Sequence, residues 1–175
     1  MRHGPATVTT TYLELVEPEP IRMPSRPAPP GFGTRIVEDP AVNAGMYRRV
    51  GADYAWLDRL RWSDRQWRRW AERIETHIVE VDGAEAGYFE LELDSPGSAK
   101  VSIFGLLGEY HGRAIGGHAL VAALDRGRAL RPRVWLTTCT LDGPHALANY
   151  RARGMRPFRV ETAGAPASLA GGRRR

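Results

Sequence analysis

The sequence is poor in the residues that crosslink a chain or carry it across a membrane. Cys139 is its single cysteine, so the 175-residue chain has no internal disulfide, and its composition fits a reducing compartment such as the cytoplasm. No stretch approaches the roughly 18 consecutive apolar residues of a membrane span. The opening segment MRHGPATVTTTYLEL lacks a long apolar core, so we expect no signal peptide. These absences favour a cytoplasmic protein with a single hydrophobic core.

The net charge of +5 raises the question of a nucleic-acid partner. Between Gly31 and Thr162 the chain carries 19 basic and 17 acidic residues, and the flanks hold the other 6 basic and 3 acidic residues. The excess therefore lies mainly in tails such as the C-terminal GGRRR. A basic tail indicates a solubilising end more often than a nucleic-acid arm. The nearly neutral centre of the chain argues against a nucleic-acid partner.

Composition divides the chain into three parts. Residues 1–31 hold an alternating stretch, 7–17, that predicts a strand laid on the main sheet. Six prolines between Pro18 and Pro30 follow it and predict an extended surface segment. Residues 32–163 are interpreted as the compact domain, and residues 164–175 as a disordered basic tail.

Within the compact domain the patterns alternate between strands and helices. The expected elements are a strand at 32–37, helices at 40–51 and 61–74, strands at 77–81, 86–93 and 99–107, a helix ending near 127, a strand at 133–141, a helix at 142–154 and a strand at 156–162. Ser63 and Gln66 form a capping box for the second helix. Trp67 and Trp70 follow the stripe of a buried helix face, which favours core packing over a base-stacking platform.

A hairpin that pairs Leu93 with Ala99 sorts two neighbouring strands into two faces. One face is apolar and is expected to pack on helices: Phe89, Leu91, Leu93, Val101 and Ile103. The other is mostly polar and is expected to line a reactant cleft or a wet surface: Tyr88, Glu90, Glu92, Lys100, Ser102 and Phe104. Tyr88 and Ser102 are therefore candidate substrate contacts.

The loop YAWLDRL precedes the second helix and adds further candidates. Trp56, Asp58 and Arg59 combine an aromatic with two charged groups, which suits the mouth of a substrate site. An ordinary surface loop with an Asp–Arg pair is the alternative interpretation of the same residues.

The stretch GEYHGRAIGGHAL, residues 108–120, follows an expected strand and opens an expected helix. Small residues let the backbone approach an anion, and the free amides and dipole of a helix N-terminus favour phosphate. This signal is weak alone, because glycine-rich helix starts are common. Together with the later LANYRARGM and the order of elements, it resembles the GNAT family of acyl-CoA-dependent N-acetyltransferases. The resemblance covers roughly Gly33 to Thr162.

The resemblance implies a mixed α/β (α+β) fold with a mostly antiparallel central sheet, flanked by helices and splayed between strands 4 and 5, counted from the strand at Phe32. It implies acetyl-CoA as the cofactor. The cofactor-binding residues that it implies are Leu106, His111, Gly112, Arg113, Ala114, Ile115, Gly116 and Gly117. The family's motif has Arg or Gln where this chain has His111, and a first glycine where it has Ala114.

The resemblance also implies the reaction, which is transfer of an acetyl or short acyl group to the primary amine of a small molecule in a ternary complex. In this interpretation the Leu106 amide binds the carbonyl oxygen, and Tyr150 donates a proton to the leaving thiolate. A half-buried structural tyrosine is the alternative for Tyr150. Some members hold a glutamate base eleven residues before the position of His111, where this chain has Lys100.

Glu90 is the expected replacement for that missing base, either acting through water or binding the cationic substrate without proton transfer. Lys100 is expected to pair across strands with Glu92. His118 and His145 are expected to be structural, and neither the histidines nor Cys139 shows metal-ligand spacing. A non-catalytic CoA-binding module and a transferase acting on a charged RNA are the alternative functions. Whether the protein forms a homodimer stays open.

Overall fold

The computed structural model describes residues 7–54 and 56–164, which form seven strands and four α-helices. In chain order the elements are β1 (Thr7–Val16), β2 (Phe32–Val37), α1 (Pro40–Gly51), α2 (Asp64–Ala71), β3 (Ile74–Val81), β4 (Ala84–Ser95), β5 (Ser98–Leu106), the 3₁₀ turn η1 (Gly108–Tyr110), α3 (Ile115–Leu130), β6 (Arg133–Cys139), α4 (Ala146–Ala152) and β7 (Arg156–Gly164). The strands form one sheet in the order β2-β3-β4-β5-β6-β1-β7. The basic tail expected to be disordered lies almost wholly outside the described residues.

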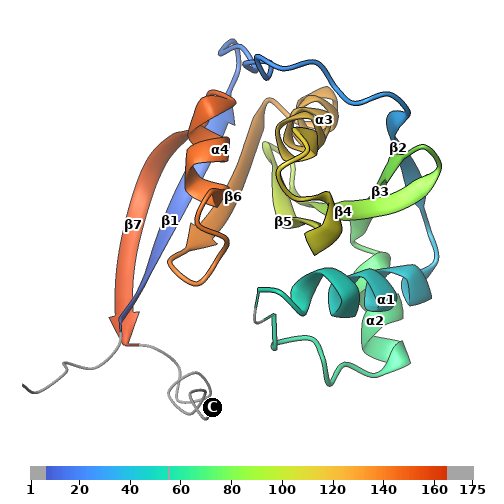
Figure 1. The fold of residues 1–175 in the computed structure, drawn as a ribbon. Coiled ribbons are helices and arrows are strands. Elements are labelled where there is room, and N and C mark those ends of the chain that lie inside the picture. Colours follow the sequence, from blue (N-terminus) through green and yellow to red (C-terminus); the bar gives the residue numbers. More distant parts are fainter. Residues whose placement is uncertain (1–6, 55, 165–175) are drawn as a thin grey trace, which may run out of the picture.

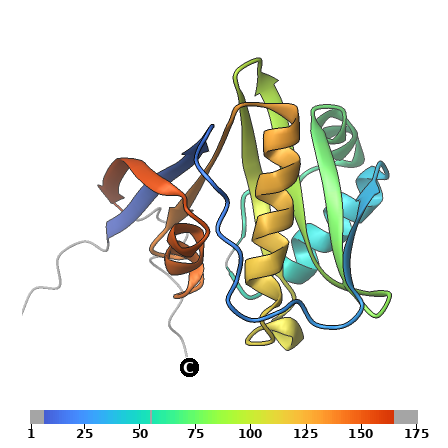
Figure 2. The same cartoon turned by 90° about the horizontal axis from the view of Figure 1, so that it is seen from above.

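Helices cover both faces of the sheet. Helices α1 and α2 pack on one face of β3, β4 and β5, and α3 crosses the opposite face (Figures 1 and 2). Helix α4 lies on the same side as α3, next to β6 and β1 (Figure 1). No helix in the described part of the chain is long and apolar enough to cross a membrane.

The sheet is splayed between β5 and β6. These strands run parallel and pair only where Ser98–Lys100 meets Arg133–Trp135. Beyond that point β5 continues to Leu106 and β6 to Cys139 without pairing to each other. All other neighbouring strands pair in antiparallel fashion. The expected mixed, mostly antiparallel sheet with a splay between these two strands is confirmed.

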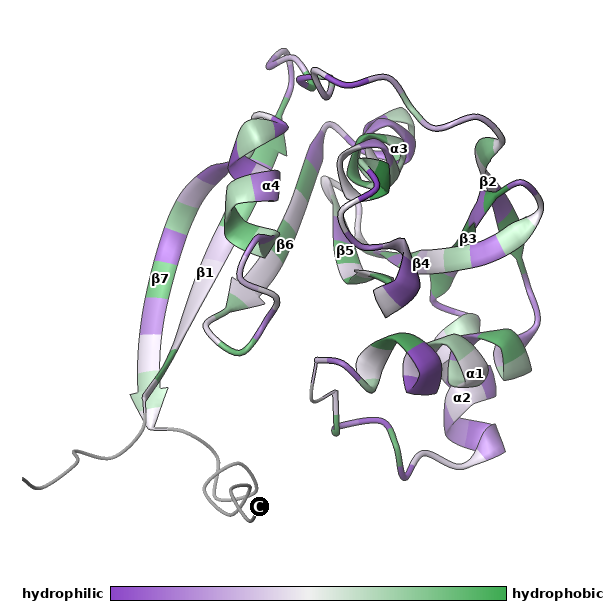
Figure 3. Ribbon diagram, viewed as in Figure 1, coloured by the Kyte–Doolittle hydropathy of each residue, from purple (hydrophilic) through white to green (hydrophobic). Residues whose placement is uncertain are grey.

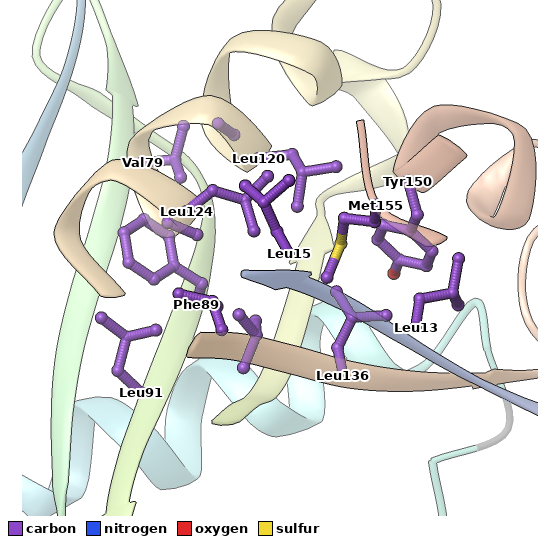
Figure 4. Close-up of a cluster of buried hydrophobic side chains, with 14 of the residues drawn as sticks. Leu13, Leu15, Val79, Phe89, Leu91, Leu120, Leu124, Leu136, Tyr150 and Met155 are labelled. Atoms are coloured by element: carbon purple, nitrogen blue, oxygen red, sulfur yellow. The ribbon is translucent and has the colours of Figure 1, made fainter. Parts of the chain in front are cut away.

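Two hydrophobic clusters lie on opposite faces of the sheet. The larger one joins β1, β4, β6, α3 and α4 (Figure 4), with Leu13, Leu15, Phe89, Leu120 and Tyr150 among its buried members. The smaller one lies under α1 and α2. Strand β7 is the exception, because it is exposed along its whole length and hydrophobic and hydrophilic residues alternate in it (Figure 3).

The N-terminal strand is part of the sheet and is not laid on it. Strand β1 is inserted between β6 and β7 and pairs in antiparallel fashion with both. The proline-rich segment then runs without regular structure across the molecule to β2 (Figure 2). It is held by hydrogen bonds from Arg22 N to Arg153 O and between His118 Nε2 and Arg26 O. His118 is thereby structural, as expected.

Helix α2 is shorter than the sequence pattern predicts. Its capping box forms as expected, since Ser63 Oγ accepts from the Gln66 amide and Gln66 Oε1 accepts from the Ser63 amide. The helix ends at Ala71, however, and Ile74 begins β3 opposite Glu92. Pairing along β4 therefore overrides the local helical preference of residues 72–74.

A β-bulge in β5 changes the expected sorting of side chains. Glu92 faces Lys100 as predicted, but Glu90 faces Ile103, which leaves Ser102 as the extra residue. After the bulge the side chains exchange faces, so Ile103 packs with the cluster under α1 and α2, and Phe104 packs with the cluster under α3. The predicted faces of Ile103 and Phe104 are therefore wrong, because a bulge shifts the alternation by one residue.

Candidate active site

A cleft of about 990 Å³ opens at the splay between β5 and β6. It is bounded by β5, β6, the start of α3, α4 and the loop before α2. Most of the predicted site residues line it: Trp56, Asp58, Arg59, Ser102, Leu106, His111, Gly112, Ala114, Gly116, Gly117 and Tyr150. A second hollow of about 840 Å³ lies between α2 and the edge formed by β2 and β3, away from the splay and from all of these residues.

Backbone groups of β5 point into the splay. The Leu107 amide donates to Ala86 O at 2.8 Å, which makes Gly87 and Leu106 a pair without mutual hydrogen bonds. The amide and carbonyl of Leu106 therefore point away from β4, toward the gap that β6 leaves open. The same alternation turns the Phe104 amide in this direction. Among the described residues, β6 does not pair with β5 at either position.

The turn before α3 has the geometry of an anion cradle. Gly112 has φ +75° and Ala114 has φ +63°, and no side chain caps the N-terminus of α3. The first amides of this 16-residue helix are thus left without a side-chain partner. A Cβ on Gly116 would make only ordinary contacts, the nearest at 3.7 Å from Leu106. The packing of the fold therefore does not require glycine here, and the missing side chain leaves room for a ligand at the cleft. These features fit the binding of a phosphate group.

The other residues of the predicted cofactor loop differ in exposure. The Ile115 side chain is buried in the larger core, so only its backbone is available to a ligand. Arg113 is exposed, and its guanidinium lies 5.4 Å from the centre of the Tyr110 ring. Asn149 Nδ2 donates to Gly116 O at 3.3 Å and so joins α4 to this turn.

His111 connects the turn to the loop before α2. Its Nε2 lies 2.7 Å from the Tyr54 hydroxyl and 3.1 Å from Leu106 O. Because a carbonyl only accepts, Nε2 carries a proton when it bonds Leu106. Tyr54 was not predicted as a site residue, although it stands in the YAWLDRL loop two residues before Trp56. Its signal was the aromatic content of that loop.

Tyr150 lies on α4 and lines the cleft. Its ring packs edge-on against Phe104 with centroids 6.2 Å apart, which places it beside the splay. Burial raises the pKa of its hydroxyl, and the negative charge of Asp142 adds to this effect. The hydroxyl is therefore protonated at neutral pH. The neighbouring side-chain hydrogen bonds join Tyr54 to His111 and Asn149 to Gly116, and neither involves this hydroxyl.

Glu90 lies beneath the wall of the cleft and does not line it. Its side chain is 0% exposed, and its carboxylate accepts from Asn43 Nδ2 at 2.9 Å, Arg59 Nη1 at 3.1 Å and Trp70 Nε1 at 2.8 Å. Burial raises its pKa, and Arg59 and the two neutral donors offset this only in part. The expectation that Glu90 faces the cleft and handles the acceptor amine, through water or by binding it, is corrected, because protein groups cover the carboxylate. Asn43 gave no signal in the sequence.

The predicted loop residues do reach the cleft, but their pairing differs from the alternative considered. Asp58 is exposed and Arg59 is partly buried, and Arg59 pairs with Glu90 instead of its sequence neighbour. Trp56 packs against α1 and β5, where a Cβ on Gly51 or Gly105 would collide with its ring or Cβ. The loop is therefore tied to the sheet at the splay.

The remaining residues of the predicted polar face lie in different surroundings. Tyr88 is fully buried in the cluster under α1 and α2 and does not line the cleft, so its predicted substrate contact is corrected. Ser102 lines the cleft and donates to Glu92 Oε2 at 3.0 Å. Lys100 stands opposite Glu92 as predicted, yet Glu92 pairs with Arg73, and Lys100 Nζ lies 4.9 Å from the centre of the Trp135 ring.

The structure resembles solved acetyltransferases, whereas comparison of the sequence with family models and curated proteins finds no match. A GCN5-related N-acetyltransferase from Kribbella flavida has 18% identity and a TM-score of 0.65, over 91% of this chain and 58% of its own. One from Sphaerobacter thermophilus has 17% identity and a TM-score of 0.61, over 90% and 50%.

A third similar structure is an aminoglycoside acetyltransferase from an uncultured soil metagenomic sample, in complex with sisomicin. It has 12% identity and a TM-score of 0.59, over 71% of this chain and 88% of its own. The chain thus spans between half and three fifths of the length of the Kribbella and Sphaerobacter proteins. At these identities the likeness concerns the fold.

Proposed function

We propose that this chain, which has the fold of the GCN5-related N-acetyltransferases, transfers an acetyl or short acyl group from acetyl-CoA to a primary amine in a ternary complex. One observation carries the proposal. The Phe104 and Leu106 amides point into a cleft that also contains an uncapped helix N-terminus and the Tyr150 hydroxyl. The amides suit the carbonyl oxygen of an activated acyl group, and the helix N-terminus suits the diphosphate of its carrier. The Tyr150 hydroxyl suits the leaving group, which needs a proton.

The described residues fit acetyl-CoA as the acyl donor. The first amides of α3, with Gly112, Ala114 and Gly116 beside them, would hold the pyrophosphate. The unpaired edge of β5 has free amides and a carbonyl. The extended, amide-containing arm of acetyl-CoA could form hydrogen bonds with them, as a neighbouring strand would. When bound, acetyl-CoA supplies the thioester whose carbonyl carbon the amine attacks, with loss of one amine proton and departure of a thiolate.

Two groups of the chain would act on the reacting atoms. The Leu106 amide would donate to the carbonyl oxygen as that oxygen gains charge. Tyr150 would give its proton to the thiolate. For free groups this transfer is uphill by about 2 kcal/mol, because a phenol has a pKa of about 10 and a thiol about 8.5. Since burial raises the pKa of Tyr150, the transfer costs more in this cleft, and the hydroxyl remains protonated until it is needed.

The amine must also lose its own proton, since an alkylammonium is neutral only about once in a thousand at pH 7. Glu90 is covered by protein groups and would not take this proton directly. Asp58, His111 and His145 are among the side chains that line the cleft, and the proton would leave through one of them or through water.

A non-catalytic CoA-binding module is the second candidate. It is favoured by the covering of Glu90 and by the alanine with positive φ in the turn. A panel of amines incubated with acetyl-CoA, with free thiol as the readout, separates the two. We expect at least one amine to raise thiol release above the rate without amine. Binding of acetyl-CoA with no such rise for any amine would favour the binding module.

A further inference from the structure

Arg59 is a guanidinium held in one place at the wall of the cleft. Its plane lies among three aromatic rings, with Cζ 4.1 Å from the centre of Trp70, 4.9 Å from Trp62 and 5.7 Å from Tyr47. Its Nη1 donates to Glu90 at 3.1 Å, and its backbone amide donates to the Tyr47 hydroxyl at 3.3 Å. Only 15% of the side chain is exposed. A long side chain loses much conformational entropy when it is fixed in one orientation. Because folding already fixes Arg59, a ligand that binds it causes little further loss.

The partner of Arg59 is fixed as well. Both oxygens of Glu90 are bonded, one by Asn43 and the other by Trp70 together with Arg59. Protein donors therefore bind both oxygens of this 0% exposed carboxylate, and it holds the guanidinium in a set orientation. This arrangement explains why a buried glutamate stands beneath the cleft without lining it.

Arg59 keeps donors that the fold does not use. A guanidinium has five N–H groups, and within the described part of the chain only Nη1 of Arg59 has a hydrogen-bond partner. Because the residue lines the cleft, the remaining edge is available to a ligand there. A guanidinium is planar, is always charged and can only donate hydrogen bonds. It therefore favours a carboxylate, which it binds through two parallel hydrogen bonds.

We propose that the acceptor is an amine that carries a carboxylate, and that Arg59 binds this carboxylate. The proposal rests on the proposed acyl transfer and narrows its acceptor class. Glu90, the anchor of Arg59, stands opposite Ile103, which is next to Phe104 and roughly 10 Å along the strand from Leu106. Arg59 and Leu106 line the same cleft, so one small molecule could reach both. Amino acids and closely related zwitterions are the smallest amines that carry a carboxylate, and they define the acceptor class that we propose.

Binding without turnover tests the proposal. The probes are the free amino acids leucine, methionine, phenylalanine and tryptophan, each with its α-carboxamide, which keeps the amine and removes the carboxylate. Affinity is followed by NMR through the indole N–H signals, because the Trp70 indole donates to Glu90 beside Arg59. We expect at least one acid to bind about 10- to 100-fold more tightly than its amide, as for a hydrogen-bonded charge.

Variants assign this preference to Arg59. Arg59→Met alone leaves Glu90 buried without its cation and risks misfolding, so it is paired with Arg59→Met/Glu90→Gln, which keeps the site neutral. We expect the double variant to fold and to bind acid and amide alike. Arg61→Met is the matched control, since Arg61 is exposed in the same loop and does not line the cleft, and it should keep the preference.

The outcomes separate this inference from the proposed function. Equal binding of all acids and amides to the unaltered protein, or an acid preference that survives in the double variant, overturns the carboxylate site. Acetylation of amines without any preference for acids over amides also overturns the carboxylate site, but it supports the proposed acyl transfer. Acid-selective binding that depends on Arg59, without acetylation of any amine, supports the site and rejects the proposed function.

Discussion

At the residue scale, the surroundings of Glu90 and Tyr150 differ. Glu90 accepts from three donors, whereas the Tyr150 hydroxyl takes part in none of the side-chain hydrogen bonds of the described residues that surround it. A carboxylate that is fully buried under protein donors is poorly placed for proton transfer to a ligand and well placed to hold Arg59. The Tyr150 phenol lines the cleft and stays protonated, so it has a proton to give, although its raised pKa makes the transfer more costly than for a free phenol. The two side chains predicted from the sequence to be catalytic, Glu90 and Tyr150, therefore have different roles.

Replacing Glu90 with Gln tests its burial through pH dependence. Burial raises the folded-state pKa of Glu90, so its contribution to stability is fully present below the unfolded pKa of about 4.3 and is lost as pH rises through the folded value. We therefore expect the stability of the native protein relative to Glu90→Gln to fall as pH increases from about 4 toward 8. Urea unfolding of both proteins across this range measures it. A relative stability that grows with pH would mean that Arg59 outweighs burial.

Replacing Tyr150 with Phe tests the proton donor. Removal of the hydroxyl should slow acyl transfer on the order of 10²-fold, as for loss of a general acid, and should leave acetyl-CoA affinity unchanged. Initial rates of thiol release and the melting shift with acetyl-CoA supply the two readouts. Unchanged turnover would return Tyr150 to a purely structural role beside Phe104.

Residue identities were predictable from the sequence where a local pattern marked them. The loop YAWLDRL indicated Trp56, Asp58 and Arg59, and all three line the cleft. The partners of Arg59 were not predictable, because Glu90 lies 31 positions away and reaches it only through the fold. The burial of Tyr88 under α1 and α2 could not be predicted for the same reason, because tertiary packing decides where these helices lie.

At the element scale, boundaries followed capping and turn chemistry, and errors arose where strands pair. Helix α1 has the predicted bounds, with Asp39 accepting from the Ala41 amide and Pro40 in its first turn. The hairpin at Asp82 and Gly83 has positive φ at both residues, as its sequence predicts. The bulge at Ser102 has no such signature. It depends on pairing with β4, and it alone reverses the faces of the rest of β5.

The turn before α3 is tested at Gly116. Saturation with acetyl-CoA at 100 times its dissociation constant should stabilise the native protein by about 2.7 kcal/mol. Gly116→Asp should abolish this, because it places bulk and negative charge where the pyrophosphate would lie. Thermal melting with and without acetyl-CoA is the measurement.

Gly116→Asn is the control for charge, since it adds similar bulk without a carboxylate. Both variants should fold, because a Cβ at this position meets only ordinary contacts. The loop would lose its assigned role if Gly116→Asp kept the full shift. The absence of any shift in the unaltered protein at millimolar acetyl-CoA would remove the proposed cofactor altogether.

At the scale of the whole molecule, one sheet unites segments from both ends of the chain. Strand β1 lies between β6 and β7, and Leu13 and Leu15 are 0% exposed within the larger core. The alternating pattern at 7–17 predicted the strand but not its place. Sheet order depends on long-range pairing, which periodicity does not encode. The splay between β5 and β6 was expected only through the family resemblance.

The insertion of β1 predicts that residues 7–16 belong to the same cooperative unit as the rest of the domain. Leu15→Ala should lower the free energy of unfolding by about 2–5 kcal/mol, as for truncation of a buried leucine. Val160→Ala on β7 is the control: its side chain is 60% exposed, so the change should stay within about 0.5 kcal/mol. Urea unfolding measures both. A Leu15→Ala variant as stable as the native protein would mean that β1 is dispensable.

The central claim is that the splay binds an acyl thioester and passes the acyl group to an amine. The most direct test is a mass balance, in which free thiol and acetylated amine are quantified together as acetyl-CoA is consumed. We predict equal amounts of the two products, formed only when protein, acetyl-CoA and amine are all present. Bound acetyl-CoA that releases no more thiol with amines than without them would contradict the account.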